Sequence, residues 1–316
     1  MEEEVLEEYL MKELQMNRWT PLLGTLRVPF LVLTPACLAV GVGTAVWQTG
    51  PVNLLEVVLV LIAGVAAHAC VNVFNEHFDF KTGLDARTAR TAFSGGSGTL
   101  QAFPHLAPSA VALAAALGGL TALIGLHFVL VKGWALLPLA LAGFVIAYIY
   151  TTWLTKNPFV CLATPGTGFG LVFVLGTHYA LTGTYTWTAF VASLVPFFLV
   201  SNLLLINQFP DVDADRTVGK RHFPLLIGRR KSAYVYGAFL LATYLAIVVG
   251  VMLSLLPWPC LLGLLTAPLA WRAFRGAVEH ADDIPALIPI LGLNVEITLL
   301  TPLLTAAGLA VGALLR

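Results

Sequence analysis

The sequence predicts an all-α protein that crosses a membrane several times. Hydrophobic residues make up 58% of its 316 residues and charged residues only 11%, whereas a soluble domain is about half apolar and about a quarter charged. The apolar residues gather in nine stretches of about 20 residues, the length that a helix needs to cross a bilayer. Long continuous apolar runs are typical of membrane helices, because barrel strands are shorter and alternate.

Charge placement gives these stretches an orientation. The nine predicted spans are 28–48, 54–74, 108–131, 133–154, 158–182, 187–208, 232–255, 257–275 and 287–315. Fifteen of the 17 Lys and Arg residues precede the first span, follow an even-numbered span or, as Arg272 and Arg275, end the eighth span, and only Lys132 and Arg316 lie on the other side. Basic residues concentrate on the cytoplasmic side of membrane proteins. We therefore expect a multi-pass protein, in the plasma membrane if it is bacterial. Its N-terminus and its polar loops at 75–107 and 209–231 would be cytoplasmic.

The chain is predicted to contain a short N-terminal helix, residues 1–20, and one nine-helix domain, residues 21–316. Glutamates alternate with apolar residues at a roughly helical spacing in the first segment. This helix would lie on the membrane surface or in solvent, and the sequence leaves both possibilities open. The formal net charge of zero shows no basic field, so a nucleic-acid partner is not expected.

Two polar motifs follow the second and sixth predicted spans. The first contains Asn75, Asp79 and Asp85, and the second contains Asn207, Asp211, Asp213 and Asp215. Residues i and i+4 share a face of a helix, so Asn75 and Asp79 should be neighbours, and so should Asn207, Asp211 and Asp215. Asp213 would then point away from them. Gly83 is expected to end the first helix, which would let Asp85 return toward Asp79.

The spacing of the two motifs indicates two related halves. Asn75 and Asn207 are 132 residues apart, as are Asp79 and Asp211. Both motifs lie on the same side of the membrane in the predicted topology. We therefore expect the two acidic clusters to face each other across a cavity.

Facing carboxylates at this position suggest magnesium and phosphate chemistry. Mg²⁺ takes oxygen ligands and is commonly held by one or two carboxylates together with substrate phosphates. Nearby cations would donate to the phosphate oxygens: Arg87, Arg90, Lys156, Arg216, Lys220 and Arg221. Such a site would stabilise a departing diphosphate electrostatically.

Three alternatives compete with this interpretation. The acidic residues could be ordinary solvated loop charges, although two matched clusters on one side argue against that. A transporter would carry its ionisable residues near the middle of the membrane, whereas these lie at span ends. A CDP-alcohol phosphotransferase would carry an Asp-Gly-x2-Ala-Arg signature, which Asp85-Ala86-Arg87 does not match.

The nine predicted spans and the two polar motifs together resemble the UbiA-type intramembrane prenyltransferase superfamily over nearly the whole chain. The resemblance implies a ring of helices around a central cavity with a cytoplasmic cap, Mg²⁺ as cofactor, and an isoprenyl diphosphate donor. It implies that Asn75, Asp79 and Asp85 form the first motif, and that Asn207, Asp211 and Asp215 form the second. Lys156 lies where the family has a diphosphate-contacting lysine, and Tyr150 is an accompanying cavity residue.

The resemblance also divides the residues by role. Asn75, Asp79, Lys156, Asn207 and Asp211 are predicted to carry catalysis, and Asp79, Asp85, Asp211 and Asp215 to hold the metal. The predicted substrate contacts are Arg27, Arg87, Arg90, Tyr150, Arg216, Lys220 and Arg221. Either Arg27 or Arg90 could hold a carboxylate of the acceptor.

Within the superfamily the sequence is most similar to the 1,4-dihydroxy-2-naphthoate polyprenyltransferases of menaquinone biosynthesis. The first motif is Asn-x3-Asp-x5-Asp, the loop continues as Ser94-Gly-Gly-Ser-Gly98, and Asp215-Arg216 is followed by Lys220-Arg221. Pro210 and the Asn75-Glu76 pair depart from the common pattern. Other aromatic acceptors, such as 4-hydroxybenzoate, homogentisate or a specialised metabolite, as well as haem and a lipid glycerol, remain open. So does the oligomeric state.

One glycine pattern has a structural explanation. Gly166-x-Gly168-x-Gly170 lies in a predicted span with no preceding strand, so close helix packing is expected there, rather than a nucleotide site.

Overall fold

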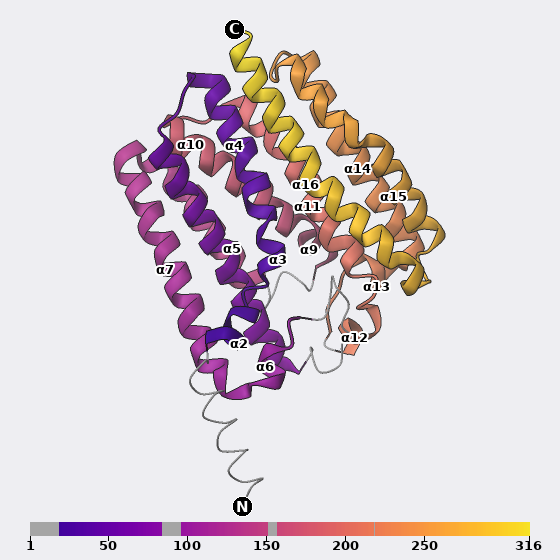
Figure 1. The fold of residues 1–316 in the computed structure, drawn as a ribbon. Coiled ribbons are helices and arrows are strands. Elements are labelled where there is room, and N and C mark those ends of the chain that lie inside the picture. Colours follow the sequence, from indigo (N-terminus) through magenta and orange to yellow (C-terminus); the bar gives the residue numbers. More distant parts are fainter. Residues whose placement is uncertain (1–18, 84–95, 151–156, 218) are drawn as a thin grey trace, which may run out of the picture.

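The computed structural model describes residues 19–83, 96–150, 157–217 and 219–316. Every regular element in these residues is helical, which confirms the predicted all-α class. Figure 1 shows the long helices running side by side, with α4, α5 and α7 in one half and α14, α15 and α16 in the other. The predicted helix at 1–20 lies almost wholly outside the described residues.

The elements follow one another in a simple order. They are α2 (Trp19–Gly24), α3 (Val28–Leu31), α4 (Leu33–Thr49), α5 (Leu54–Thr82), α6 (Thr99–Ala102), η1 (Pro104–Leu106), α7 (Ala107–Lys132), η2 (Trp134–Leu136), α8 (Leu137–Tyr150), α9 (Pro158–Gly166), η4 (Thr167–Leu175), α10 (Gly176–Thr182), α11 (Trp187–Asn207), α12 (Val212–Thr217), α13 (Phe223–Ile227), α14 (Arg229–Met252), η5 (Trp258–Thr266), α15 (Ala267–Glu279) and α16 (Ile284–Leu314).

Seven helices in the described part of the chain are long and apolar enough to cross a membrane. They coincide with seven of the nine predicted spans: Val28–Thr49, Leu54–Thr82, Pro104–Lys132, Pro158–Thr182, Trp187–Asn207, Arg229–Met252 and Ile284–Leu314. Predicted span 133–154 corresponds to the shorter apolar helix Trp134–Tyr148. Predicted span 257–275 corresponds to a 3-10 segment followed by α15, which carries Arg272 and Arg275. The count of nine spans therefore stays a prediction.

Large apolar side chains cover the outside of the bundle. Leu123 and Leu130 of α7 are 68% and 63% exposed, and Leu241 of α14 is 60% exposed. Such a surface would be costly in water, but it is the surface that a lipid-facing helix needs. The chain is thus an integral multi-pass membrane protein.

Close backbone contact holds the middle of the bundle together. A Cβ atom added at Gly170 would lie 2.6 Å from the Cα of Phe197 in α11, and Gly166 meets the same stretch of α11. Gly168 has no neighbour within 4 Å of such an atom. Two of the three glycines therefore confirm the expected packing role, since small residues let membrane helices approach.

Buried polar side chains join the helices of the second half. The Tyr236 hydroxyl in α14 donates to Asn294 Oδ1 in α16 at 2.9 Å, and Asn202 Nδ2 in α11 donates to the Tyr236 carbonyl at 2.9 Å. All three residues are fully buried. Hydrogen bonds of this kind contribute about 0.6–2 kcal/mol each between membrane helices.

The two motif segments lie at the same end of the bundle. In Figure 1, α12 of the second motif and α6, the next described helix after the first motif, lie at the lower end of the bundle beside α2, and the C-terminus lies at the upper end. The predicted placement of both polar loops on one side is therefore consistent with the fold.

Candidate active site

The first motif occupies the last turns of α5. The helix begins at Leu54, where the Asn53 side chain accepts a hydrogen bond from the Leu55 amide, and it ends before Gly83. Gly83 has φ +69°, a left-handed conformation that favours glycine, so the predicted helix end is confirmed. Asn75 and Asp79 lie one turn apart on the unbroken helix, and both are partly buried.

The second motif does not form one continuous helix, and our expectation that Asn207 and Asp211 would stack on one helix face was wrong. Helix α11 ends at Asn207, residues 208–211 form a turn, and α12 begins at Val212. Pro210 has no amide hydrogen and disfavours a helical conformation at the residue before it. Helical order resumes at once, because the Asp215 amide donates to the Asp211 carbonyl at 2.9 Å.

An Arg residue holds this turn in place. Arg229 Nε, at the beginning of α14, donates to the Phe209 carbonyl at 2.8 Å, and its Nη2 atom lies 3.8 Å from Asp213 Oδ2. The Phe209 side chain is fully buried beneath the turn. The break in the helix is thus a packed feature with its own hydrogen-bond partner.

Asp215 binds two neighbouring side chains. Lys220 Nζ lies 2.9 Å from its Oδ1 atom, and His222 Nε2 lies 3.0 Å from its Oδ2 atom. The Asp215 side chain is 5% exposed, whereas that of Asp213 is 84% exposed. Asp213 therefore points away from the cluster, as the helical spacing predicted.

Lys220 connects the two motifs electrostatically. Burial would lower the pKa of the Lys220 ammonium, but the charges of Asp215, Asp79 and Asp211 outweigh burial and raise this pKa. Burial would likewise raise the pKa of Asp215, but the hydrogen bond with His222 and the Lys220 charge hold it below its ordinary value. The charges of aspartates from both motifs thus act on one cation, which contacts Asp215 directly.

The structure places only some of the other predicted residues. Arg216 in the last turn of α12 and Arg221 in the loop after it are both exposed. Arg27 lies beside the first motif, with Nε 3.9 Å from Glu76 Oε1. Asp85, Arg87, Arg90 and Lys156 lie outside the described residues, as does the side chain of Tyr150.

Three residues near the motifs were not predicted. Glu76 is almost fully buried between Arg27 and Ser97, and His222 is buried against Asp215. Glu76 was noted only as a departure from a pattern, and Ser97 only as part of a glycine-rich loop. The sequence signal for Glu76 was an acidic residue directly beside the motif Asn at the end of an apolar span. A charge that is buried at such a place needs a partner. Nothing in the sequence indicated His222.

The residues present fit a hard divalent cation. The donors from the two motifs are carboxylate and amide oxygens, the ligands that Mg²⁺ prefers. The side-chain oxygen Oδ1 of Asn207 is buried and has no hydrogen-bond partner among the described residues. The Lys220 ammonium also shows that this position stabilises a positive charge. No three His, Cys, Asp or Glu side chains in the described ranges would bind a metal by themselves. Mg²⁺ bound with substrate phosphates needs fewer protein carboxylates.

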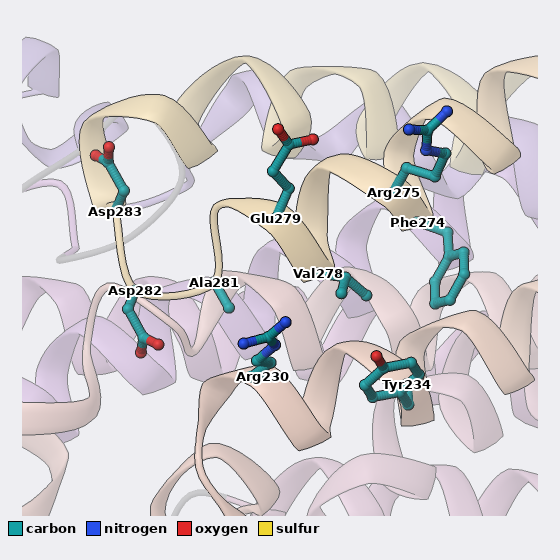
Figure 2. A pocket seen from close by; sticks show the side chains of 9 residues that line it. All are labelled: Arg230, Tyr234, Phe274, Arg275, Val278, Glu279, Ala281, Asp282 and Asp283. Carbon is teal, nitrogen blue, oxygen red and sulfur yellow. The ribbon is translucent and has the colours of Figure 1, made fainter.

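A separate pocket of about 740 Å³ opens at the beginning of α14. Figure 2 shows that side chains from α14, α15 and the turn before α16 line it, among them Arg230, Tyr234, Arg275 and Asp282. None of the predicted site residues contributes to this pocket.

Comparison with known proteins decides the family. The family model described as the UbiA prenyltransferase family matches residues 33–288. The chain belongs to the UbiA prenyltransferase family. It is therefore a transferase of prenyl groups, and the predicted superfamily and enzyme class are confirmed.

Several relatives share sequence with this chain, and a solved structure shares its fold. It is 30% identical over 260 residues to the 1,4-dihydroxy-2-naphthoate octaprenyltransferase of Mycobacterium leprae, covering 79% of this chain and 83% of that enzyme. It is also 30% identical over 233 residues to protoheme IX farnesyltransferase 1 of Paramagnetospirillum magneticum, covering 73% and 75%. A UbiA homolog from Archaeoglobus fulgidus bound to GPP and Mg²⁺ has the same fold, with TM-score 0.63 and 16% identity over 92% of this chain and 99% of that one.

Proposed function

We propose that this UbiA-family prenyltransferase moves a prenyl chain from an isoprenyl diphosphate to 1,4-dihydroxy-2-naphthoate in an Mg²⁺-dependent reaction. The observation that carries this proposal is the position of Lys220. Its ammonium lies 2.9 Å from the Asp215 carboxylate, and the charges of Asp79 and Asp211 also raise its pKa, so carboxylates of both motifs act on this cation. A diphosphate and its metal ions need such a position, where negative ligands and a positive donor lie together.

The motif residues would hold the metal and the cations would hold the diphosphate. Asp79, Asp211, Asn75 and Asn207 would bind Mg²⁺, together with Asp85 and Asp215. Bound there, Mg²⁺ would supply neutralisation of the charge that develops on the diphosphate. Lys220 and the exposed Arg216 and Arg221 would donate to its oxygens, joined by Arg87, Arg90 and Lys156.

The side chains would also control the bond changes. The allylic C–O bond of the donor breaks, its electron pair leaves with the diphosphate, and an electron-rich carbon of the acceptor ring bonds the allylic carbon. The ring then loses a proton, or its carboxylate as CO₂, and the electron pair of that broken bond restores the aromatic ring. Positive charge on the allylic carbon is stabilised by aromatic faces. Phe74 and Tyr148, whose ring centroids are 5.9 Å apart near the first motif, are suited to this role.

Two comparisons support the chemistry and the acceptor. The A. fulgidus homolog was solved with GPP and Mg²⁺, which supports the donor and the cofactor. The M. leprae relative is named for the naphthoate acceptor, and the Asn-x3-Asp-x5-Asp spacing of the first motif resembles that of the naphthoate group. The P. magneticum relative acts on haem, so haem is the acceptor that the test must include. We further propose that the motif end of the bundle faces the cytoplasm, as the distribution of Lys and Arg predicts.

The test is a transfer assay on the purified full-length protein. We would incubate it with farnesyl or geranylgeranyl diphosphate, Mg²⁺ and one of three acceptors: dihydroxynaphthoate, 4-hydroxybenzoate or haem. Mass spectrometry would detect the prenylated product. A naphthoate product that requires Mg²⁺ supports the proposal. A product with another acceptor alone would overturn the acceptor but keep the chemistry.

A further inference from the structure

Glu76 is a buried carboxylate that the proposed chemistry does not use. It lies on α5 directly after Asn75, and its side chain is 1% exposed. Both of its oxygens accept short hydrogen bonds from one residue: Oε1 from the Ser97 amide at 2.6 Å, and Oε2 from the Ser97 hydroxyl at 2.8 Å. A buried charge without partners would cost several kcal/mol, and the Ser97 amide and hydroxyl supply partners for this carboxylate.

The backbone around Ser97 is shaped for this contact. Gly96 and Gly98 have φ of +67° and +77°, and Gly98 precedes α6. Left-handed conformations on both sides of Ser97 turn its amide and hydroxyl toward the same carboxylate, and glycine adopts them without a Cβ clash. This gives the glycine-rich stretch a structural purpose.

The same face of α5 holds the turn before α3. Asn72, one helical turn before Glu76, donates through Nδ2 to the Leu26 carbonyl at 2.9 Å. The next residue, Arg27, has φ +51°, which is unusual for a residue with a side chain. Its guanidinium carbon lies 4.6 Å from the centre of the Phe30 ring. The backbone and the ring together aim the Arg27 side chain at the motif end of α5.

The ion pair between Arg27 and Glu76 is loose. Its single contact measures 3.9 Å, whereas Ser97 binds the carboxylate at 2.6 and 2.8 Å. In the described residues the terminal nitrogens of Arg27 have no hydrogen-bond or ion-pair partner closer than this. Arg27 thus keeps a forked donor pair, which matches a carboxylate. Glu76 and Asp79 are three residues apart, or about 4.5 Å along the helix axis.

We propose that Glu76 is a positioning residue for the acceptor: clamped by Ser97, it fixes Arg27 beside the first motif so that Arg27 binds the carboxylate of an aromatic acid. This inference rests on the proposed function, because it needs an acidic acceptor. Ser97 makes the short hydrogen bonds with the Glu76 carboxylate. Glu76 can therefore orient Arg27 from 3.9 Å without a close ion pair that would neutralise the guanidinium.

The test is a double-mutant cycle on acceptor binding. Glu76→Gln and Arg27→Gln should each raise KM for dihydroxynaphthoate about tenfold, roughly the effect of one charge-assisted hydrogen bond, while KM for the donor changes less than about twofold. The double variant should be no worse than Arg27→Gln alone, since Glu76 acts through Arg27. Ser97→Ala should raise acceptor KM less than Glu76→Gln does.

The matched control is Glu56→Gln. Glu56 lies 20 residues earlier on the same helix and pairs with Lys132 at 2.8 Å, about 30 Å from Glu76 along the axis. Its loss should leave both KM values unchanged. If Glu76→Gln is poorly folded, Glu76→Asp replaces it in the cycle.

The outcomes separate this inference from the proposed function. Additive effects of Glu76→Gln and Arg27→Gln, or equal rises in donor and acceptor KM, overturn the positioning role even if the wild type prenylates naphthoate. If the wild type uses 4-hydroxybenzoate instead, the proposed acceptor is wrong, and the same cycle with that acid decides the inference. If the wild type uses neither acid, both ideas fall.

Discussion

The Lys220 ammonium lies 2.9 Å from the Asp215 carboxylate and also within the electrostatic influence of Asp79 and Asp211. One lysine thus connects two motifs that are 132 residues apart in the chain. This cation offsets part of the negative charge that would attract metal ions, and under the proposed function it would donate to the diphosphate once the substrate is bound.

Replacing this lysine should affect metal and donor in opposite directions. Lys220→Gln removes a competing positive charge from the acidic cluster, so the Mg²⁺ concentration for half-maximal activity should fall. It also removes a phosphate donor, so kcat/KM for the prenyl diphosphate should fall at least about tenfold. Steady-state assays at varied Mg²⁺ and varied donor give both numbers. A rise in the Mg²⁺ requirement would show that Lys220 does not compete with the metal.

The two motif aspartates should each be needed for turnover. Asp79→Asn and Asp211→Asn keep the shape of the side chain but remove its charge, and each should lower kcat by about 10²–10³, the scale of a lost electrostatic contact to a transition state. Asp213→Asn is the matched control, because its side chain is 84% exposed and lies on the far side of α12. It should stay within about twofold of the wild type.

Removing the metal tests the same site without a mutation. Dialysis against EDTA should abolish transfer, and Mg²⁺ should restore it, because the site offers mainly hard oxygen donors. The measurement is product formation before and after adding back Mg²⁺. Full activity in EDTA would contradict the role that we assign to the two motifs.

The sequence predicted the long helices well, because a bilayer imposes length and apolarity on each span. It predicted the end of α5 for a similarly local reason: Gly83 favours the left-handed backbone found there. The break after Asn207 was missed, although Pro210 was visible. The i+4 spacing of the motif residues predicts one helix face, but a proline lacks the amide hydrogen that a continuous helix needs.

Contacts between distant segments were beyond such reasoning. The pairing of Glu76 with Ser97 depends on how a loop returns to α5, and that of Asp215 with His222 depends on the path of the chain after α12. Neither has a periodic signature. Lys220 was predicted to contact substrate. Its ion pair with Asp215 and the effect of Asp79 and Asp211 on its pKa became visible only with the fold.

The hydrogen bond between the Tyr236 hydroxyl and Asn294 should contribute to the stability of the fold and not to catalysis. Tyr236→Phe leaves the buried Asn294 oxygen without its donor, which should lower the free energy of unfolding by about 1 kcal/mol. Thermal unfolding in detergent measures this loss. Tyr234→Phe is the control, since Tyr234 is 55% exposed and should change little. A reduced kcat per folded molecule in Tyr236→Phe would point to a functional role instead.

The glycines of the fifth predicted span allow a comparison of one methyl group at two neighbouring positions. In Gly170→Ala the new Cβ would lie 2.6 Å from backbone atoms of Phe197, so α11 must move or the bundle must strain. Overpacking of this kind costs about 1–3 kcal/mol. In Gly168→Ala the new Cβ meets nothing within 4 Å, and alanine favours helical backbone over glycine by up to about 1 kcal/mol. We therefore expect Gly170→Ala to lower the unfolding temperature in detergent and Gly168→Ala to leave it equal or higher. Equal losses at both positions would mean that backbone freedom, and not contact with Phe197, requires glycine in this segment.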